Sequence, residues 1–145
     1  MLESSVASVI EPRKLVVAAP RTSVAEAARL MRESHVGAVL VVEGERLVGI
    51  FTERDAVFRV MAAGGDPAAT TLDGVMTRDP VTVAPDETFG YALLLMHEHG
   101  FRHVPVVDDG RPVGVISARH ALDPDLEDFA VEVDRRRHIR RRAAR

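Results

Sequence analysis

The chain has 145 residues, of which 46% are hydrophobic and 28% charged, a composition typical of a soluble globular protein with one domain or two half-domains. Cysteine is absent, so disulfides, thiol catalysis and thiolate metal sites are excluded. The net charge of -3 conceals a division: residues 135–145 hold seven of the 19 basic residues and no acid, while residues 1–134 carry 12 basic and 22 acidic residues. Only the tail is therefore expected to attract a polyanion.

The first residues, MLESSVASVIEP, contain neither a basic segment nor an apolar run long enough to cross a membrane. We therefore expect a cytoplasmic protein without a signal peptide or a membrane contact.

The first copy of an internal repeat begins with an extended segment, residues 15–18, followed by a helix. Ser23 lies three residues before Glu26, which is the spacing of a capping box at a helix start. Apolar residues at helical spacing predict the buried face of this helix: Val24, Ala27, Ala28 and Met31.

A strand hairpin is predicted next, because the apolar runs 36–42 and 47–51 flank the polar turn EGER. The first strand is almost continuously apolar and should be covered on both faces. A second helix follows and is expected to end at Gly64 and Gly65.

The same unit recurs 65 residues later. Residues 16–55 align without a gap to residues 81–120, and 14 of the 40 pairs are identical. The second copy has an extended segment at 81–83, a helix that starts after Thr88, and a hairpin formed by residues 104–107 and 112–116. The buried face of this helix is predicted at Phe89, Ala92, Leu93 and Met96. Neither β-α-β-β-α copy is large enough to be stable alone, so we expect the two to pack sheet-to-sheet.

Residues 123–145 are acidic in the first half and basic in the second, an order that suits the dipole of a single helix. Leu126, Phe129, Ala130 and Val133 have helical spacing and predict an apolar stripe that packs on the body or on a dimer mate. The alternative is that the arginines bind nucleic acid, which the acidic body disfavours.

Thr52 and Asp55 lie three residues apart, where the first hairpin meets its helix. The spacing fits a capping box at a helix start. It also fits a ligand site, because free amides at a helix start attract phosphate, and a carboxylate can accept hydrogen bonds from two ribose hydroxyls. The two roles are compatible, and the residues alone leave both open.

Other reactive chemistries are disfavoured. His97, Glu98, His99 and His103 lack the HExxH spacing, so no intrinsic metal is expected. Ser117 and His120 have a capping spacing without a nucleophile elbow. We therefore expect no catalytic residues and no enzymatic activity.

Three stretches, in their order, spacing and duplication, resemble a tandem pair of cystathionine-β-synthase (CBS) domains, the Bateman module. They are GAVLVVEGERLVGIFTERD at 37–55, VMTRDPVTVAPDET at 75–88 and FRHVPVVDDGRPVGVIS at 101–117. The resemblance implies an α/β (α+β) fold of two repeats, 9–65 and 76–122, with pseudo-twofold symmetry, a linker at 66–75 and a C-terminal helical tail at 123–145. It also implies adenine-nucleotide clefts between the repeats and a homodimer.

In this family G-h-x-T-x-x-D is the nucleotide motif, which implies that Thr52 donates to phosphate or ribose, that Asp55 accepts from ribose and that Ile50 contacts adenine. The resemblance extends the nucleotide site to Gly37, Arg54, Met76, Thr77, Val81, Arg102 and His103. Arg102 and His103 are assigned to phosphate, which suits the forked donors of arginine. The ligand is expected to be AMP, ADP or ATP, with NAD or S-adenosylmethionine as further candidates.

The second copy departs from the motif, because His120 stands where the acid is expected. A histidine cannot accept two hydrogen bonds from a diol as a carboxylate does. Val16, Val115, Ser117 and His120 are therefore assigned to a second site that is altered or empty. The sequence thus predicts a regulatory nucleotide sensor that signals to an unidentified protein partner; the alternatives are a dimerisation adaptor with vestigial sites and a nucleic-acid binder.

Overall fold

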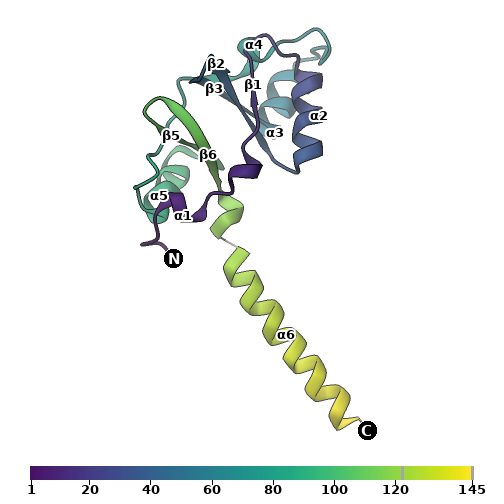
Figure 1. Ribbon diagram of the computed structural model, residues 1–145. Helices are drawn as coiled ribbons and strands as arrows, with labels where there is room; N and C mark the ends of the chain where they lie inside the picture. Colours follow the sequence, from purple (N-terminus) through teal and green to yellow (C-terminus); the bar gives the residue numbers. More distant parts are fainter. Residues whose placement is uncertain (122, 145) are drawn as a thin grey trace.

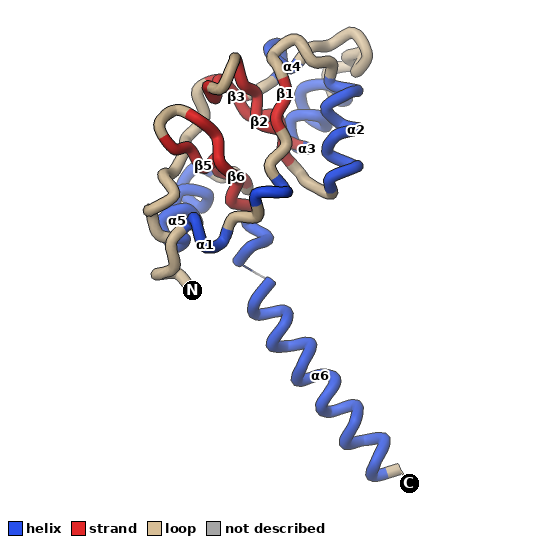
Figure 2. Tube along the Cα trace, viewed as in Figure 1, coloured by secondary structure: helices blue, strands red, loops and turns tan. Residues whose placement is uncertain are grey.

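A computed structural model describes residues 1–121 and 123–144, and it contains two β-sheets that face each other and a long C-terminal helix that projects away from them (Figure 1). The first sheet has the order β1-β2-β3-β4 and the second pairs β5 with β6 (Figure 2). The strands are β1 (Val17–Ala18), β2 (Ala38–Glu43), β3 (Arg46–Thr52), β4 (Thr77–Arg78), β5 (His103–Asp108) and β6 (Arg111–Ser117). Strand β1 runs parallel to β2, whereas the β2–β3 and β3–β4 pairs are antiparallel.

The two hairpins share one register, which confirms the repeat at the level of backbone pairing. The β2–β3 ladder shifts between Val41 and Val42, and the β5–β6 ladder shifts between Val106 and Val107, at the equivalent point. A parallel bridge between Val83 and Val106 takes the place that β1 has in the first sheet. Residues 38–41 of β2 are all buried, as predicted for a strand covered on both faces.

The first helix of each copy is α2 (Val24–Ser34) or α5 (Phe89–His99), and both start as predicted. Ser23 Oγ accepts from the Glu26 amide at 3.1 Å, and Thr88 Oγ1 accepts from the Tyr91 amide at 3.2 Å. The predicted buried face is confirmed in α5 at Phe89, Ala92 and Met96, with Leu93 partly buried, and in α2 at Val24, Ala27 and Met31. Ala28 is exposed, so the prediction for that position is wrong, because the buried stripe is narrower than the apolar pattern.

The second helix differs between the copies. In the first, α3 (Glu53–Asp55) continues as a π-helical segment, Ala56–Met61, and Gly64 then adopts φ 70°, which ends the helix. In the second, a 3-10 turn at Ala118–Ala121 precedes α6 (Asp123–Ala143).

Two short helices are exchanged between the copies. Helix α1 (Val6–Val9) packs into the core of the second copy, where the Val6 amide donates to Glu87 O at 2.8 Å. Helix α4 (Leu72–Val75) packs into the first core, where the Leu72 amide donates to Thr22 O at 2.9 Å. The stretch 66–75, expected to be a linker, therefore contributes a helix to the first copy, and the exchange ties the two copies together.

The sheets contact each other through an apolar cluster of Ala38, Leu40 and Ile50, against which Val115 of the second sheet packs. At the hairpin turns the Leu47 amide donates to Gly110 O at 3.2 Å. These contacts confirm the predicted sheet-to-sheet packing.

Helix α6 extends away from the two sheets (Figure 1). Phe129 is 63% exposed and Ala130 is exposed, so the prediction that the apolar stripe packs on the body of its own chain is wrong at these positions. The side chain of Leu126 lies outside the described residues. Across residues 1–121 and 123–144, no helix combines the length and apolar character that a membrane crossing requires.

Candidate functional site

The end of β3 and the start of α3 form the capping box that the spacing of Thr52 and Asp55 predicts. Thr52 Oγ1 accepts from the Asp55 amide at 3.3 Å, and Asp55 Oδ2 accepts from the Thr52 amide at 2.9 Å and from its hydroxyl at 3.2 Å. The second carboxylate oxygen, Oδ1, lies 3.5 Å from Arg59 Nε. The box fixes the orientation of Asp55, whose side chain is 13% exposed.

A cavity of about 590 Å³, the Asp55 cavity, opens beside this capping box between the two copies. It is lined by Ile50, Thr52, Glu53, Arg54, Asp55, Phe58, Thr77, Asp79, Pro80, Val81, Phe101, Arg102 and His103. The structure therefore brings together eight of the residues assigned to the nucleotide site: Ile50, Thr52, Arg54, Asp55, Thr77, Val81, Arg102 and His103. Asp55 thus serves as a helix cap and also borders a cavity.

Two residues assigned to this site do not line the Asp55 cavity. Met76 is 5% exposed and packs beneath β3, where a Cβ on Gly49 would lie 3.0 Å from Met76 Cγ. Gly49 therefore lets the segment that carries Thr77 approach β3 closely, which explains the glycine of the motif in physical terms. Gly37 lines a second cavity, described below.

Sequence reasoning missed Arg59, which lies four residues after Asp55. Its guanidinium Nη1 donates to Val75 O at 3.2 Å and to Met76 O at 3.1 Å, while Nε faces Asp55. Arg59 thus holds together the capping box and the segment from the second copy that forms the opposite wall. The (i, i+4) spacing from Asp55 was a usable signal, but the carbonyl partners were not visible in the sequence.

Sequence reasoning also missed Phe58, which lies at the cavity beside Arg54. The guanidinium carbon of Arg54 is 5.4 Å from the centre of the Phe58 ring, and Nη1 donates to Gly100 O at 3.3 Å. This contact bridges the two copies at the edge of the Asp55 cavity. Glu53, Asp79, Pro80 and Phe101 also line the cavity, and no motif in the sequence singles them out.

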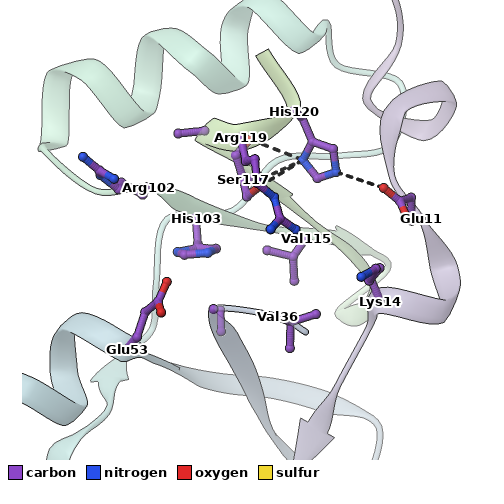
Figure 3. A pocket seen from close by; sticks show the side chains of 13 residues that line it. Glu11, Lys14, Val36, Glu53, Arg102, His103, Val115, Ser117, Arg119 and His120 are labelled. Atoms are coloured by element: carbon purple, nitrogen blue, oxygen red, sulfur yellow. Dashed lines mark hydrogen bonds and ion pairs between the residues drawn. The ribbon is translucent and has the colours of Figure 1, made fainter. Parts of the chain in front are cut away.

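The second copy has its own cavity of about 470 Å³, the His120 cavity (Figure 3). It is lined by Glu11, Lys14, Val36, Gly37, Ala38, Glu53, Arg102, His103, Val115, Ser117, Ala118, Arg119 and His120. Val115, Ser117 and His120 lie there as assigned, whereas Val16 packs against the first core. Sequence reasoning missed Glu11, Lys14 and Arg119.

His120 takes over the capping role of Asp55 with different chemistry. The Ser117 amide lies 2.9 Å from His120 Nδ1, and since an amide can only donate, Nδ1 is the acceptor. The ring proton then resides on Nε2, which faces Glu11 Oε1 at 3.8 Å (Figure 3). The His120 cavity therefore presents an N–H donor and no carboxylate at the position equivalent to Asp55.

Glu53, Arg102 and His103 line both cavities and form the wall between them. A Cβ on Gly37 would lie 3.0 Å from His103 Nε2, so the absence of a side chain at Gly37 makes room for this wall. Burial lowers the pKa of His103 below its ordinary value of 6.5; Glu53 opposes this shift, and Arg119, His120 and Arg102 add to it. One arginine and one mostly neutral histidine are thus available to either cavity.

Acidic and basic side chains differ in number between the cavities. The Asp55 cavity has three carboxylates (Glu53, Asp55, Asp79) and two guanidinium groups (Arg54, Arg102). The His120 cavity has two carboxylates (Glu11, Glu53) and three cations (Lys14, Arg102, Arg119). Within the described part of the chain, no three His, Cys, Asp or Glu residues lie close enough together to hold a metal ion.

Two interlocked α/β copies that enclose two unlike cavities define a tandem-repeat module. A family model described as CBS domain matches the chain twice, over residues 6–62 and 72–126, and the chain therefore belongs to the CBS-domain family as a tandem pair, a regulatory class of module.

Two known relatives match most of this chain. The "Meiotically up-regulated gene 70 protein" of Schizosaccharomyces pombe is 38% identical over 118 residues, which cover 74% of this chain and 16% of that protein. An inosine-5'-monophosphate dehydrogenase of Korarchaeum cryptofilum is 33% identical, over 81% of this chain and 24% of the enzyme. The chain thus spans a minor part of these two relatives, and their whole-protein activities do not transfer to it.

Solved structures share the fold over nearly their whole length. An uncharacterized conserved protein from Pyrococcus horikoshii superposes with a TM-score of 0.79 at 29% identity, covering 86% of this chain and 94% of that one. The CBS domain pair of protein MJ0100, crystallised with 5'-methylthioadenosine and S-adenosyl-L-methionine, gives a TM-score of 0.73 at 26% identity, covering 81% and 96%.

Proposed function

We propose that this CBS pair is a sensor that binds one adenine nucleotide in the Asp55 cavity. The observation that carries the proposal is the convergence of a carboxylate, a hydroxyl and a guanidinium from both copies on one cavity: Asp55, Thr52 and Arg102. The carboxylate suits a ribose diol, and the guanidinium suits a phosphate. Ile50 and Val81 offer apolar surface for an adenine ring.

The complex of protein MJ0100 with two adenosine-containing ligands supports an adenosine-type ligand for the shared fold. For this chain we propose AMP, ADP or ATP, with NAD and S-adenosylmethionine as further candidates. Because the wall residues come from both copies, a ligand would favour one relative arrangement of the two sheets. A protein partner in the cytoplasm would read this change as a population shift, without catalysis by the chain itself.

We also propose that the chain forms a homodimer through its body. Val57, Phe58 and Met61, on the π-helical segment, are 48%, 59% and 70% exposed, an amount of apolar surface on one short helix that suits a protein contact. A dimerisation adaptor without a ligand is the competing function, and the nucleotide titration below separates the two.

Isothermal titration calorimetry of AMP, ADP, ATP, NAD and S-adenosylmethionine tests the sensor. The informative variant is Asp55→Asn, which keeps an oxygen for the Thr52 amide but removes the charge, and the matched control is His120→Asn in the other cavity. We expect one adenylate to bind with about one equivalent per chain, with binding at least tenfold weaker in Asp55→Asn and unchanged in the control. Absence of binding across the whole series would leave the adaptor function.

A further inference from the structure

The longest helix of the chain separates its charges along its axis. Helix α6 has 21 residues, which corresponds to a length of about 30 Å, and it extends away from the sheets (Figure 1). Residues 123–134 contain six acidic and no basic residues, and residues 135–143 contain six arginines and no acidic residue. Glu132 and Arg136 form an ion pair at 2.8 Å where the two halves meet.

Apolar side chains of α6 are left open to solvent. Phe129, Val131 and Ile139 are 63%, 70% and 59% exposed. Side chains this exposed contribute little to stability through burial, and most of the stability of a helix in a protein comes from the packing of its apolar face. The charge order helps through the helix dipole, but only by tenths of a kcal/mol for each exposed charge. A partner surface is needed to stabilise the helix.

We propose that α6 pairs in antiparallel orientation with α6 of a second copy of this chain. In that orientation the acidic half of each helix lies along the arginine half of the other, so the complementary contact is made twice. A parallel pair would set acid against acid and arginine against arginine, which is repulsive. The same charge order that is favourable within one helix is therefore self-complementary between two.

The pattern along one face of α6 suits this pairing. Phe129, Val133, Arg136 and Arg140 lie at i, i+4, i+7 and i+11 and so share one face. An antiparallel partner that overlaps α6 fully sets its Val133 against Val133 and places its arginines over Phe129. The aliphatic stems of these arginines can cover apolar surface, and a guanidinium can stack on the ring of Phe129.

Charge also argues against nucleic acid as the occupant of this helix. The arginines are adjoined by six acidic residues on the same helix and by a body whose residues 1–122 carry four more acidic than basic residues. A phosphate backbone following the helix would meet these acids, whereas a second α6 meets its own complement.

Cysteine cross-linking tests the orientation directly, because the natural chain has no cysteine. In the register that overlaps the two helices fully, Val133 lies near its own counterpart, and Phe129 lies near Arg136 or Arg137 of the partner. We expect Val133→Cys to cross-link to itself on mild oxidation. Phe129→Cys and Arg136→Cys should each cross-link weakly alone and several-fold more when the two variants are mixed. Preferential self-cross-linking of Phe129→Cys, or no cross-link at Val133→Cys, would overturn the proposal.

Charge reversal provides the second measurement, by sedimentation of the full chain at low salt. Changing Arg140, Arg141 and Arg142 to Glu should weaken the α6-dependent association by about tenfold or more. Adding Asp125→Lys, Glu127→Lys and Asp128→Lys to the same chain should restore it, because both halves are then reversed. The body contact proposed above is insensitive to both sets, so a change in the dissociation constant between parent and variants reports the α6 contact alone. Association that is unchanged by reversal, or that occurs only with added duplex DNA, contradicts the proposal.

Discussion

His120 and Asp55 occupy equivalent positions in the two repeats, and each accepts a hydrogen bond of 2.9 Å from the backbone amide three residues earlier. Both copies therefore use a side-chain acceptor at this position, a carboxylate in the first and an imidazole nitrogen in the second. A carboxylate keeps further acceptor capacity toward the cavity, whereas the imidazole presents a donor on its other nitrogen. Replacement of Asp by His preserves the helix start and changes the chemistry offered to a ligand.

Exchanging these residues tests that separation of roles. Asp55→His should lower nucleotide affinity by at least tenfold while leaving the melting temperature within a few degrees of the parent, because the capping acceptor is retained. His120→Asp should leave the first site intact and add acceptor capacity to the His120 cavity, raising the nucleotide stoichiometry toward two. Calorimetry gives affinity and stoichiometry, and circular dichroism gives the melting temperature. A large loss of stability in Asp55→His would show that the two caps are not interchangeable.

The wall between the cavities leads to a second prediction, which rests on the proposed nucleotide site. Arg102 lines both cavities, so a phosphate bound to it from one side removes it from the other. Arg102→Gln should weaken ATP binding by about tenfold to a hundredfold and adenosine binding by less than about twofold.

The matched control for this wall is Arg119→Gln, because Arg119 lines the His120 cavity and not the Asp55 cavity. Inorganic tripolyphosphate should compete with ATP in the parent protein and not in Arg102→Gln. Equal losses of affinity for ATP and for adenosine would indicate that Arg102 stabilises the fold and does not bind phosphate.

Much of this architecture was predictable, because the evidence for it is local. Ser23, Thr88 and the Thr52–Asp55 spacing act within one turn of helix, and the buried faces follow the helical period. The 65-residue repeat then implied two equal units, and the family motif selected Thr52, Asp55 and Ile50 as site residues.

The remaining features depend on contacts between distant segments. Val6 and Leu72 lie in helices of four residues, too short for a periodic signal. Each is buried in the other copy and not in the copy that it precedes in the sequence. Arg59 donates hydrogen bonds to the backbone carbonyls of Val75 and Met76. Every residue has such a carbonyl, so the sequence does not indicate which ones an arginine will contact. The direction of α6 was also not predictable, because an apolar stripe shows that burial is favourable but not against which surface.

The pH dependence of stability should reflect His103. Its pKa is lowered in the folded protein, so the unfolded chain binds a proton first as the pH falls below 6.5. Above pH 6.5 this group therefore leaves the free energy of unfolding unchanged. As the pH falls below 6.5, the free energy of unfolding decreases by at most about 1.4 kcal/mol per pH unit. His103→Gln should flatten this loss in urea unfolding between pH 7.5 and 5.0. The exposed His97 on α5 is the control, and a slope that changes equally in His97→Gln would contradict the assignment.

The close contact at Gly49 gives the last prediction. A methyl group there would press on the buried side chain of Met76, whose position is fixed by Arg59 through the Met76 carbonyl. Gly49→Ala should cost about 1 to 3 kcal/mol of unfolding free energy. Gly74→Ala in α4 is the matched control, because a Cβ there meets no atom within 4 Å, and its effect should be neutral or stabilising by up to about 1 kcal/mol.

The cost of Gly49→Ala should shrink when Met76 is shortened to Ala, because the methyl group then fills space that Met76 vacates. A double-mutant cycle of the two substitutions measures this coupling. Additive effects would mean that glycine is required at position 49 for its backbone conformation. The close approach of the Thr77 segment to β3 would then not depend on the missing side chain.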